Sequence, residues 1–140
     1  MELVTRKIQF STQGNSEIIK LTDKVQGHLG DTSSKSGLIH LFIAGATGGL
    51  TTMEYEPGLV EDLRNSLERI APEDADYCHN LTHDDRNGHS HIRASLIGPS
   101  LSIPFENGGL NLGEWQDIVF IDFDNRPRER EVILQILGER

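Results

Sequence analysis

Four of the six histidines in the chain, His79, His83, His89 and His91, fall within 13 residues. An even spread of histidines would leave such a window with fewer than one. The segment that holds them, residues 77–91, is otherwise polar and is predicted to be a loop. Polar loops crowded with titratable groups often carry chemistry, so this segment is the candidate functional site.

Three interpretations of this segment are open. Neutral imidazoles, with or without a carboxylate, suit a divalent metal such as zinc and leave a position for water or substrate. Alternatively, His91 and the free N–H groups at the start of a helix predicted at 88–97 bind a phosphate group. The third interpretation is a flexible loop of solvated histidines with no ligand.

The backbone around His89 and His91 decides whether these two side chains can share a ligand. Residues two apart lie on the same face of a strand but point about 200° apart on a helix. Asn87 suits the N-cap of the predicted helix, and Gly98 ends its pattern. If the helix begins at Asn87 or Gly88, we expect one of the two histidines to point elsewhere.

Single residues outside this segment are weaker candidates. Glu54 or Glu56 can serve as a general base or a metal ligand, or be a solvated carboxylate. Cys78 is interpreted as a buried or half-buried small apolar residue, and His40 as a core or half-exposed histidine with its hydrogen bonds satisfied. Trp115 is interpreted as a core or subunit-contact residue in preference to the wall of a ring-binding pocket.

The elements that must position these residues follow from the periodicity of apolar side chains. Alternation and apolar runs predict strands at 2–10, 16–21, 37–45, 50–55, 101–105, 117–124 and 130–137. Helical spacing and caps predict helices at 22–29, 57–70 and 88–97. This order favours an α+β fold over a doubly wound parallel one. We expect a mostly antiparallel β-sandwich with two to three helices packed on it, in one domain spanning 1–140.

Composition narrows the class of protein. The chain has 140 residues, of which 36% are apolar and 25% charged, and a formal net charge of -9. These values indicate a globular protein without a membrane span, and they argue against nucleic acid as the main partner because phosphate backbones are bound by clustered Lys and Arg. The single cysteine excludes an internal disulfide. A cytoplasmic location is expected.

Several motifs together resemble the YjbQ-like family, and the resemblance spans nearly the whole chain. The C-terminal signature corresponds to residues 100–105, 109–110 and 112–118 of this sequence. The other matching positions are Glu54, Asp62, Tyr77, His79, Asn87, His91 and the closing residues 126–130. Two positions depart from the pattern: Gly45 stands where many members have histidine, and Met53 where they have asparagine. The chain is similar to a subgroup with glycine at the first position and an added histidine at the position of His89.

The resemblance implies an α+β sandwich that assembles as a homotrimer with its polar site near the subunit contacts. It also implies a metal-assisted enzyme that acts on a small phosphorylated substrate. The activity attributed to the family is secondary thiamine-phosphate synthase, which joins a hydroxymethylpyrimidine diphosphate to a thiazole phosphate and releases pyrophosphate. The alternatives are a metal-dependent hydrolase or phosphatase, and a non-enzymatic trimer that binds an anion or a metal.

The same resemblance implies roles for individual residues. The metal, expected to be zinc, or the phosphate would be bound by three histidines: His79, His89 and His91. His91 and Glu54 are the candidate catalytic residues. Asn87 and Ser90 are the candidates for holding a cofactor or the substrate phosphate. Replacement of the family's histidine by Gly45 implies that the ligands are redistributed or that the activity differs.

Overall fold

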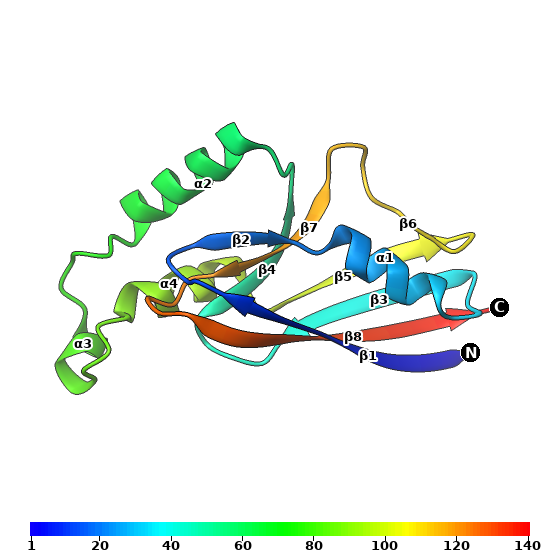
Figure 1. Ribbon diagram of the computed structural model, residues 1–140, viewed down its shortest axis with the longest axis horizontal. Coiled ribbons are helices and arrows are strands. Elements are labelled where there is room, and N and C mark those ends of the chain that lie inside the picture. The colour runs from blue at the N-terminus through cyan, green and yellow to red at the C-terminus, as the bar shows by residue number, and fades with distance from the viewer.

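Two antiparallel sheets make up most of the computed structural model, which describes residues 1–140 (Figure 1). The larger sheet has the order β1-β8-β3-β5-β6, with strands Glu2–Thr12 (β1), Arg128–Glu139 (β8), Ser36–Ile43 (β3), Ser100–Glu106 (β5) and Gly109–Leu110 (β6). The smaller sheet has the order β2-β7-β4, with strands Glu17–Lys20 (β2), Asp117–Asp122 (β7) and Gly48–Met53 (β4). The expected α+β class and the mostly antiparallel pairing are therefore confirmed.

The main core lies between the two sheets because their strands alternate apolar and polar side chains. Along β8, Val132, Leu134 and Ile136 are buried, whereas Gln135 and Leu137 are exposed on the opposite face. The sheets are joined by an edge-to-face contact of Phe10 and Phe120, whose ring centroids are 5.3 Å apart. This rigid two-sheet core supports the helices that carry the histidine segment.

Four helices are present: Thr22–Gly30 (α1), Pro57–Ile70 (α2), Cys78–Thr82 (α3) and Gly88–Ile97 (α4). The predicted helices at 57–70 and 88–97 are confirmed at both ends. The prediction of two to three helices was wrong by the short helix α3, which lies inside the segment interpreted as a loop. Its five residues are too few to show an apolar stripe in the sequence. None of the helices is long and apolar enough to cross a membrane.

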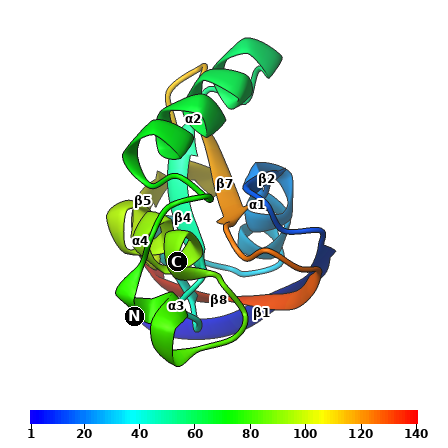
Figure 2. The same ribbon diagram turned by 90° about the vertical axis from the view of Figure 1, so that its left-hand side faces the viewer.

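The helix α2 begins where it does because Glu56 caps it. The Glu56 carboxylate accepts hydrogen bonds from the N–H groups of Gly58 at 2.9 Å and Leu59 at 2.7 Å, and Pro57 occupies the first turn. Glu56 is therefore engaged in capping and is not a free base. At the far end, α2 leads into α3, which lies in front of α4 at one end of the molecule (Figure 2).

Candidate functional site

Three imidazole rings gather where α3 meets α4. His79 lies in α3, and His83 is the extended residue that directly follows this helix. Their rings are stacked, with centroids 4.4 Å apart and planes 5° from parallel. The ring of His91, on the second turn of α4, lies 4.5 Å from that of His79 at 41°. We call these three residues the histidine cluster.

The packing of α3 on α4 depends on two features at Gly88. Its N–H donates to the Asn80 side chain at 3.0 Å, which ties the two helices together. A Cβ atom at Gly88 would lie 2.6 Å from Cβ of Tyr77, so only glycine allows this approach. Tyr77 is itself held by a hydrogen bond from its hydroxyl to the carbonyl oxygen of Pro72 at 2.5 Å.

Buried polar atoms without hydrogen-bond partners concentrate in the same region. Of five such side-chain atoms in the chain, four belong to this segment: His79 Nδ1, Asn87 Oδ1, His89 Nδ1 and Ser90 Oγ. Native proteins pair almost all buried polar atoms, so a group of unpaired ones at a helix start indicates a place built for a ligand. This site reaches from the histidine cluster to the first turn of α4.

Asp124 is a buried carboxylate that contacts the site through Asn87. Its carboxylate accepts from Asn87 Nδ2 at 3.3 Å, from Thr47 Oγ1 at 3.1 Å and from Arg128 Nη1 at 2.7 Å. Burial alone would raise the pKa of the Asp124 carboxyl, but the hydrogen bonds from Asn125, Asn87 and Thr47 and the charge of Arg128 outweigh burial and hold it below its usual value. Asp124 is therefore an anion that fixes the position of Asn87. Asn87 is the N-cap residue of α4, as predicted, but its side chain donates to Asp124 and makes no capping hydrogen bond to the helix backbone.

A second buried carboxylate stabilises the strands beneath. Asp122 accepts two hydrogen bonds from Arg130, Nε at 2.7 Å and Nη2 at 2.8 Å, and a third from Thr12 Oγ1 at 2.6 Å. Arg130 Nη2 also donates to Thr47 Oγ1 at 2.9 Å. These contacts join β1, β7 and β8 to Thr47, the residue that precedes β4. Because Thr47 also donates to Asp124, the two buried carboxylates belong to one network.

The surroundings of His89 and His91 favour the neutral form of these two imidazoles. Burial lowers the pKa of His91, and the nearby His79 lowers it further, against the opposing charges of Asp124 and Asp85. Burial also lowers the pKa of His89, aided by the positive charge of Arg93. Neutral imidazoles offer both a hydrogen-bond donor and a lone pair, which suits either a phosphate oxygen or a metal ion.

The structure brings together only two of the three histidines expected to share a ligand. His79 and His91 are in the cluster, but His89 is only 2% exposed, makes none of the ring contacts and lies close to the charge of Arg93. The reason is that α4 begins at Gly88, so His89 and His91 are both helical and their side chains point about 200° apart, as expected from the sequence for a helix that starts there. His83 takes the place expected for His89. Its four-residue spacing from His79 was the available signal in the sequence, and the short helix α3 that ends just before His83 brings the two rings together.

Glu54 lies apart from the histidine cluster. It is exposed in the turn between β4 and α2, whereas the cluster follows the other end of α2. A helix of 14 residues is about 21 Å long, which separates the two ends. The structure therefore gives no support within one chain to a catalytic partnership of Glu54 and His91.

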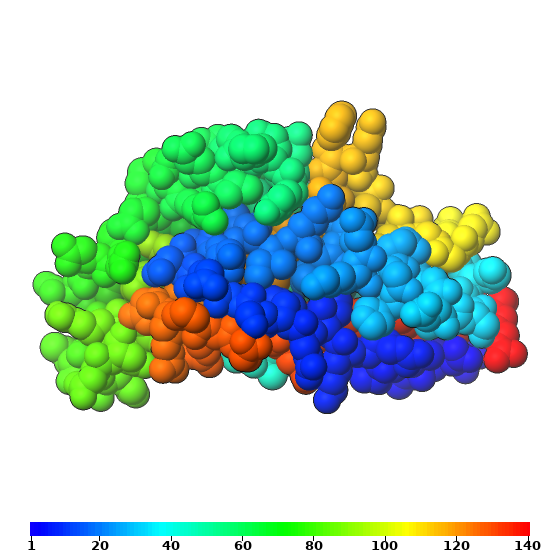
Figure 3. All heavy atoms as spheres, in the orientation of Figure 1, coloured from blue at the N-terminus to red at the C-terminus, as the bar shows by residue number.

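The remaining single-residue interpretations have mixed outcomes. His40 is half-buried and shares a 2.8 Å hydrogen bond with Ser102, as the satisfied-histidine interpretation expects. The interpretation of Cys78 as a buried residue is wrong, since it is exposed at the start of α3. Trp115 is 69% exposed and so does not fill the core of this chain. The surface around residues 112–117 projects from the molecule (Figure 3).

The histidine cluster has the right donors for a metal but not the arrangement. Three imidazoles are a familiar zinc donor set. No group of three or more His, Cys, Asp or Glu side chains in the chain is placed to hold a metal ion. The expected set of His79, His89 and His91 fails this test for the helical reason given above.

The sequence matches a known family over most of its length. Residues 6–139 match the family described as UPF0047 protein YjbQ-like. The chain belongs to the YjbQ-like family. Its resemblance to that family, first seen in the residues of the C-terminal signature, is thereby confirmed.

Relatives and solved structures of the YjbQ-like family agree with this assignment. A UPF0047 protein of Methanothermobacter thermautotrophicus is 34% identical over 139 residues, which are 99% of this chain and 95% of the relative. One from Archaeoglobus fulgidus is 36% identical and covers 94% of this chain and 99% of its own. A YbjQ-like protein of unknown function from Sulfolobus solfataricus P2 superposes with a TM-score of 0.89 at 27% identity, covering 99% of this chain and 100% of that one. A hypothetical protein from Aeropyrum pernix K1 gives a TM-score of 0.85 at 32% identity, covering 96% and 99%.

Proposed function

We propose that this protein is an enzyme that binds a small phosphorylated substrate between the histidine cluster and the first turn of α4. The observation that carries the proposal is the set of buried, unpaired polar atoms on His79, Asn87 and Ser90. A phosphate group accepts several hydrogen bonds at once, and a helix N-terminus adds a favourable dipole. Both features are needed here because the chain as a whole carries a net charge of -9 and repels anions.

The chain's own residues have distinct parts in this proposal. The imidazoles of His79 and His91 and the hydroxyl of Ser90 donate to phosphate oxygens. Asp124 acts as a positioning residue, because it fixes the side chain of Asn87. His91 transfers a proton to or from the reacting group, a role suited to a histidine whose pKa lies below its ordinary value and which is therefore a free base at neutral pH.

The reaction proposed is transfer of a group from a diphosphate, with thiamine-phosphate synthesis as the named activity. Such a reaction breaks a carbon–oxygen bond to the diphosphate and forms a carbon–nitrogen bond, so negative charge grows on the leaving group. Donors already aimed at the leaving group lower that barrier. The imidazole N–H groups of His79 and His91 would act in this way. The dipole of α4 would add to them, although the N–H groups of Gly88, Ser90 and His91 already donate to Asn80 Oδ1 and Asn87 O and are not free as expected from the sequence.

A divalent metal such as zinc is part of the proposal as an addition to these residues. The donors available to it are the imidazoles of His79, His83 and His91, and it would supply positive charge to the phosphate oxygens. Because those rings as placed do not form a metal-binding group, every role above is assigned to the chain itself.

The decisive experiment is an assay of purified protein for thiamine phosphate from its two phosphorylated precursors, with and without added zinc. We expect product, and we expect His91→Ala to reduce the rate by about a hundredfold or more, the range typical of a lost acid–base group. His28→Ala, in α1 and away from the site, is the matched control. Release of inorganic phosphate without coupling would favour the phosphatase alternative. Phosphate binding with no turnover of any substrate would favour the non-enzymatic anion-binding trimer.

We further propose that the protein works as a homotrimer. The outer face of the larger sheet presents neighbouring apolar side chains on three strands, since Leu3 pairs with Leu137 and Leu137 with Leu38. All three are exposed, as is Phe42 further along β3. A face of this kind is uncommon on a monomer and suits contact with other copies of the chain.

A further inference from the structure

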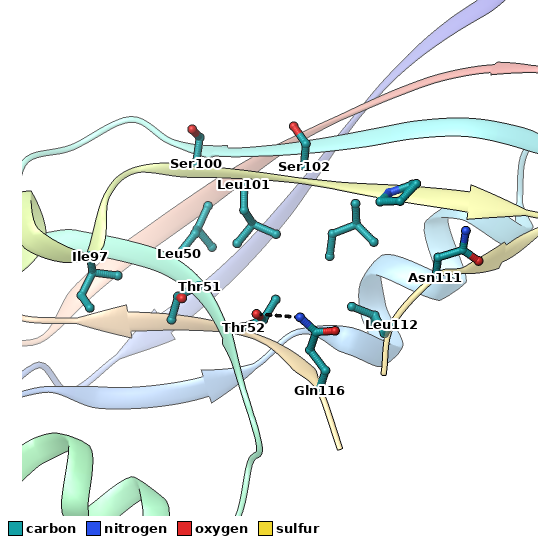
Figure 4. Close-up of a pocket in the computed structure, with 12 residues that line it drawn as sticks. Leu50, Thr51, Thr52, Ile97, Ser100, Leu101, Ser102, Asn111, Leu112 and Gln116 are labelled. Carbon is teal, nitrogen blue, oxygen red and sulfur yellow. Dashed lines mark hydrogen bonds between the residues drawn. The ribbon is translucent and has the colours of Figure 1, made fainter. Parts of the chain in front are cut away.

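A cavity of about 320 Å³ lies between the two sheets, at the end of α4 opposite to the histidine cluster. It is bounded by β4, by β5 and by the chain between β6 and β7. The last two boundaries include much of the family's C-terminal signature. Figure 4 shows Leu50 and Leu101 on its apolar side and Thr52 with Gln116 on its polar side. Its volume is at the lower end of the range of small-molecule sites, about 300–1,000 Å³.

The backbone of β4 presents a free donor and a free acceptor to this cavity. Phe123 N–H donates to Thr47 O at 2.9 Å. In an antiparallel pair, the residues whose backbone groups point to the partner strand alternate with those whose groups point away. The backbone groups of Thr51 therefore point toward β7, and those of Thr52 point away from it. The Leu50 N–H, on the same outer edge, donates to Gly98 O at 3.0 Å. Thr52 therefore offers its N–H and C=O together on the edge that borders the cavity.

The opposite wall repeats this arrangement on β5. Ile43 N–H donates to Pro99 O at 2.9 Å, so the backbone groups of Ser100 and Ser102 point away from β3. Pro104, two residues after Ser102, uses this same outer edge of β5: its carbonyl oxygen accepts from Asn111 N–H at 2.9 Å. The side chains of Ser100 and Ser102 point away from the cavity (Figure 4), and only their backbone groups border it.

The occupant is a small molecule and not an added strand, because both ends of the gap are closed. The Leu50–Gly98 hydrogen bond closes one end. At the other end, Gln116 Nε2 donates to Thr52 Oγ1 at 3.0 Å, while Gln116 Oε1 accepts from Gly113 N–H at 3.0 Å. An extended peptide needs an open edge along its length.

The chemistry of the walls defines the ligand class. None of the 12 lining residues is charged, so the cavity offers nothing to balance a phosphate or a carboxylate. The aliphatic side chains of Leu50, Leu101, Ile103 and Leu112 suit the faces of a flat ring. A strand residue that offers its N–H and C=O side by side can form two hydrogen bonds to a ligand. The ligand edge must then carry an acceptor next to a donor, as a lactam does.

We infer that this cavity is a second binding site, which takes a neutral planar heterocycle with a lactam-type edge and pairs that edge with the backbone of Thr52 or Ser102. The site is separate from the histidine cluster and does not rest on the proposed function.

The test uses 2-pyridone, a neutral lactam, and N-methyl-2-pyridone, which lacks the donor but has nearly the same shape. Binding to the ¹⁵N-labelled full chain is followed by the backbone amide signals of Thr52 and Ser102. We expect saturable shifts with 2-pyridone in the millimolar range and affinity about tenfold weaker for the N-methyl compound, the loss typical of one hydrogen bond. Inorganic phosphate is expected to leave both signals in place.

Two variants locate the binding. Thr52→Phe fills the cavity from β4 and is expected to weaken 2-pyridone binding about tenfold or more. Asn65→Phe adds the same side chain on the exposed side of α2 and is expected to change nothing; thermal unfolding of both variants checks that they fold. Equal affinity for the two pyridones, shifts that map to the histidine cluster, shifts caused by phosphate, or no shift up to the solubility limit would each overturn the inference.

Discussion

At the scale of single residues, the site is defined by what its side chains leave unpaired. Asn87 uses its nitrogen on Asp124 and leaves its oxygen free, and Ser90 is fully buried with its hydroxyl unused. Leaving a buried polar group unsatisfied costs about 1–3 kcal/mol, so a chain carries several of them at one place only where a ligand or ordered water completes them.

Acid is expected to strengthen anion binding at the histidine cluster. The pKa of His91 is lowered in the free protein, so its ring is neutral at neutral pH and gains charge only as the pH falls. Affinity for sulfate, whose own charge stays constant, should therefore rise as the pH is lowered from about 7.5 to about 5.5 in a chelator-containing buffer. Calorimetric titration measures this, with His91→Gln expected to flatten the pH dependence. The opposite trend, weaker binding in acid, is what a site dependent on a metal ion would give.

The same histidines make the fold sensitive to acid. His89 is buried with a lowered pKa, so between its folded and unfolded pKa values the unfolded chain binds more protons than the folded one. The free energy of unfolding is therefore highest above the ordinary histidine value of about 6.5 and falls as the pH drops below it. Urea unfolding at a series of pH values measures the trend. His89→Gln should remove part of it, and an unchanged slope in that variant would show that other groups are responsible.

At the scale of elements, α3 and α4 position the site and the charged pair beneath them fixes the strands. The N-cap residue Asn87, apolar spacing and Gly98 predicted α4 to the residue, and Gly98 ends the helix with φ of 96°. Apolar spacing could not predict α3, whose five residues owe their conformation to packing and to Asn80. For this reason the sequence placed His79 and His91 in one ligand set with His89, whereas the structure puts His83 and not His89 beside them.

Gly88→Ala should separate α3 from α4. The added methyl group would lie 2.6 Å from Cβ of Tyr77, which the backbone can relieve only by moving. We expect a loss of about 1–3 kcal/mol in the free energy of unfolding, as for other overpacked sites, together with weaker phosphate binding. Gly27→Ala is the matched control, since nothing lies within 4 Å of a Cβ there. Denaturant unfolding and phosphate titration of both variants check the result, and equal behaviour of the two would contradict it.

The buried ion pair of Asp122 and Arg130 should be needed for the fold. Asp122→Asn keeps the shape but leaves the Arg130 guanidinium buried without its counter-charge. Removal of one partner of such a pair typically costs about 3–5 kcal/mol. Lys7→Gln, at an exposed pair on β1, should have little effect because solvent screens that interaction. Thermal unfolding compares the two, and a small loss for Asp122→Asn would show that the network tolerates a neutral partner.

At the scale of the whole molecule, assembly is the property least accessible from one chain. Alternation along the strands predicted which side chains face the core, but it does not tell an exposed Leu137 on a free surface from one that contacts another copy. We expect the protein to behave in solution as three times its chain mass of 15.6 kDa. Leu137→Lys places a charge in the middle of the apolar row and should give monomers. Light scattering measures the mass, with Asn65→Lys, on the exposed side of α2, as the control; a monomeric starting protein would refute the assembly.

The antiparallel pairing of β1 with β8 also has a practical consequence. Because Glu2 pairs with Gly138, the two chain ends lie side by side at the end of the molecule away from α3 (Figure 1). A purification tag fused to either terminus would sit next to Leu3 and Leu137, where it can disturb self-association without touching the histidines. Cleaved, untagged material is thus the appropriate sample for sizing. The closeness of the termini equally permits a circular permutant, joined by a short linker and reopened at the Asn107–Gly108 turn.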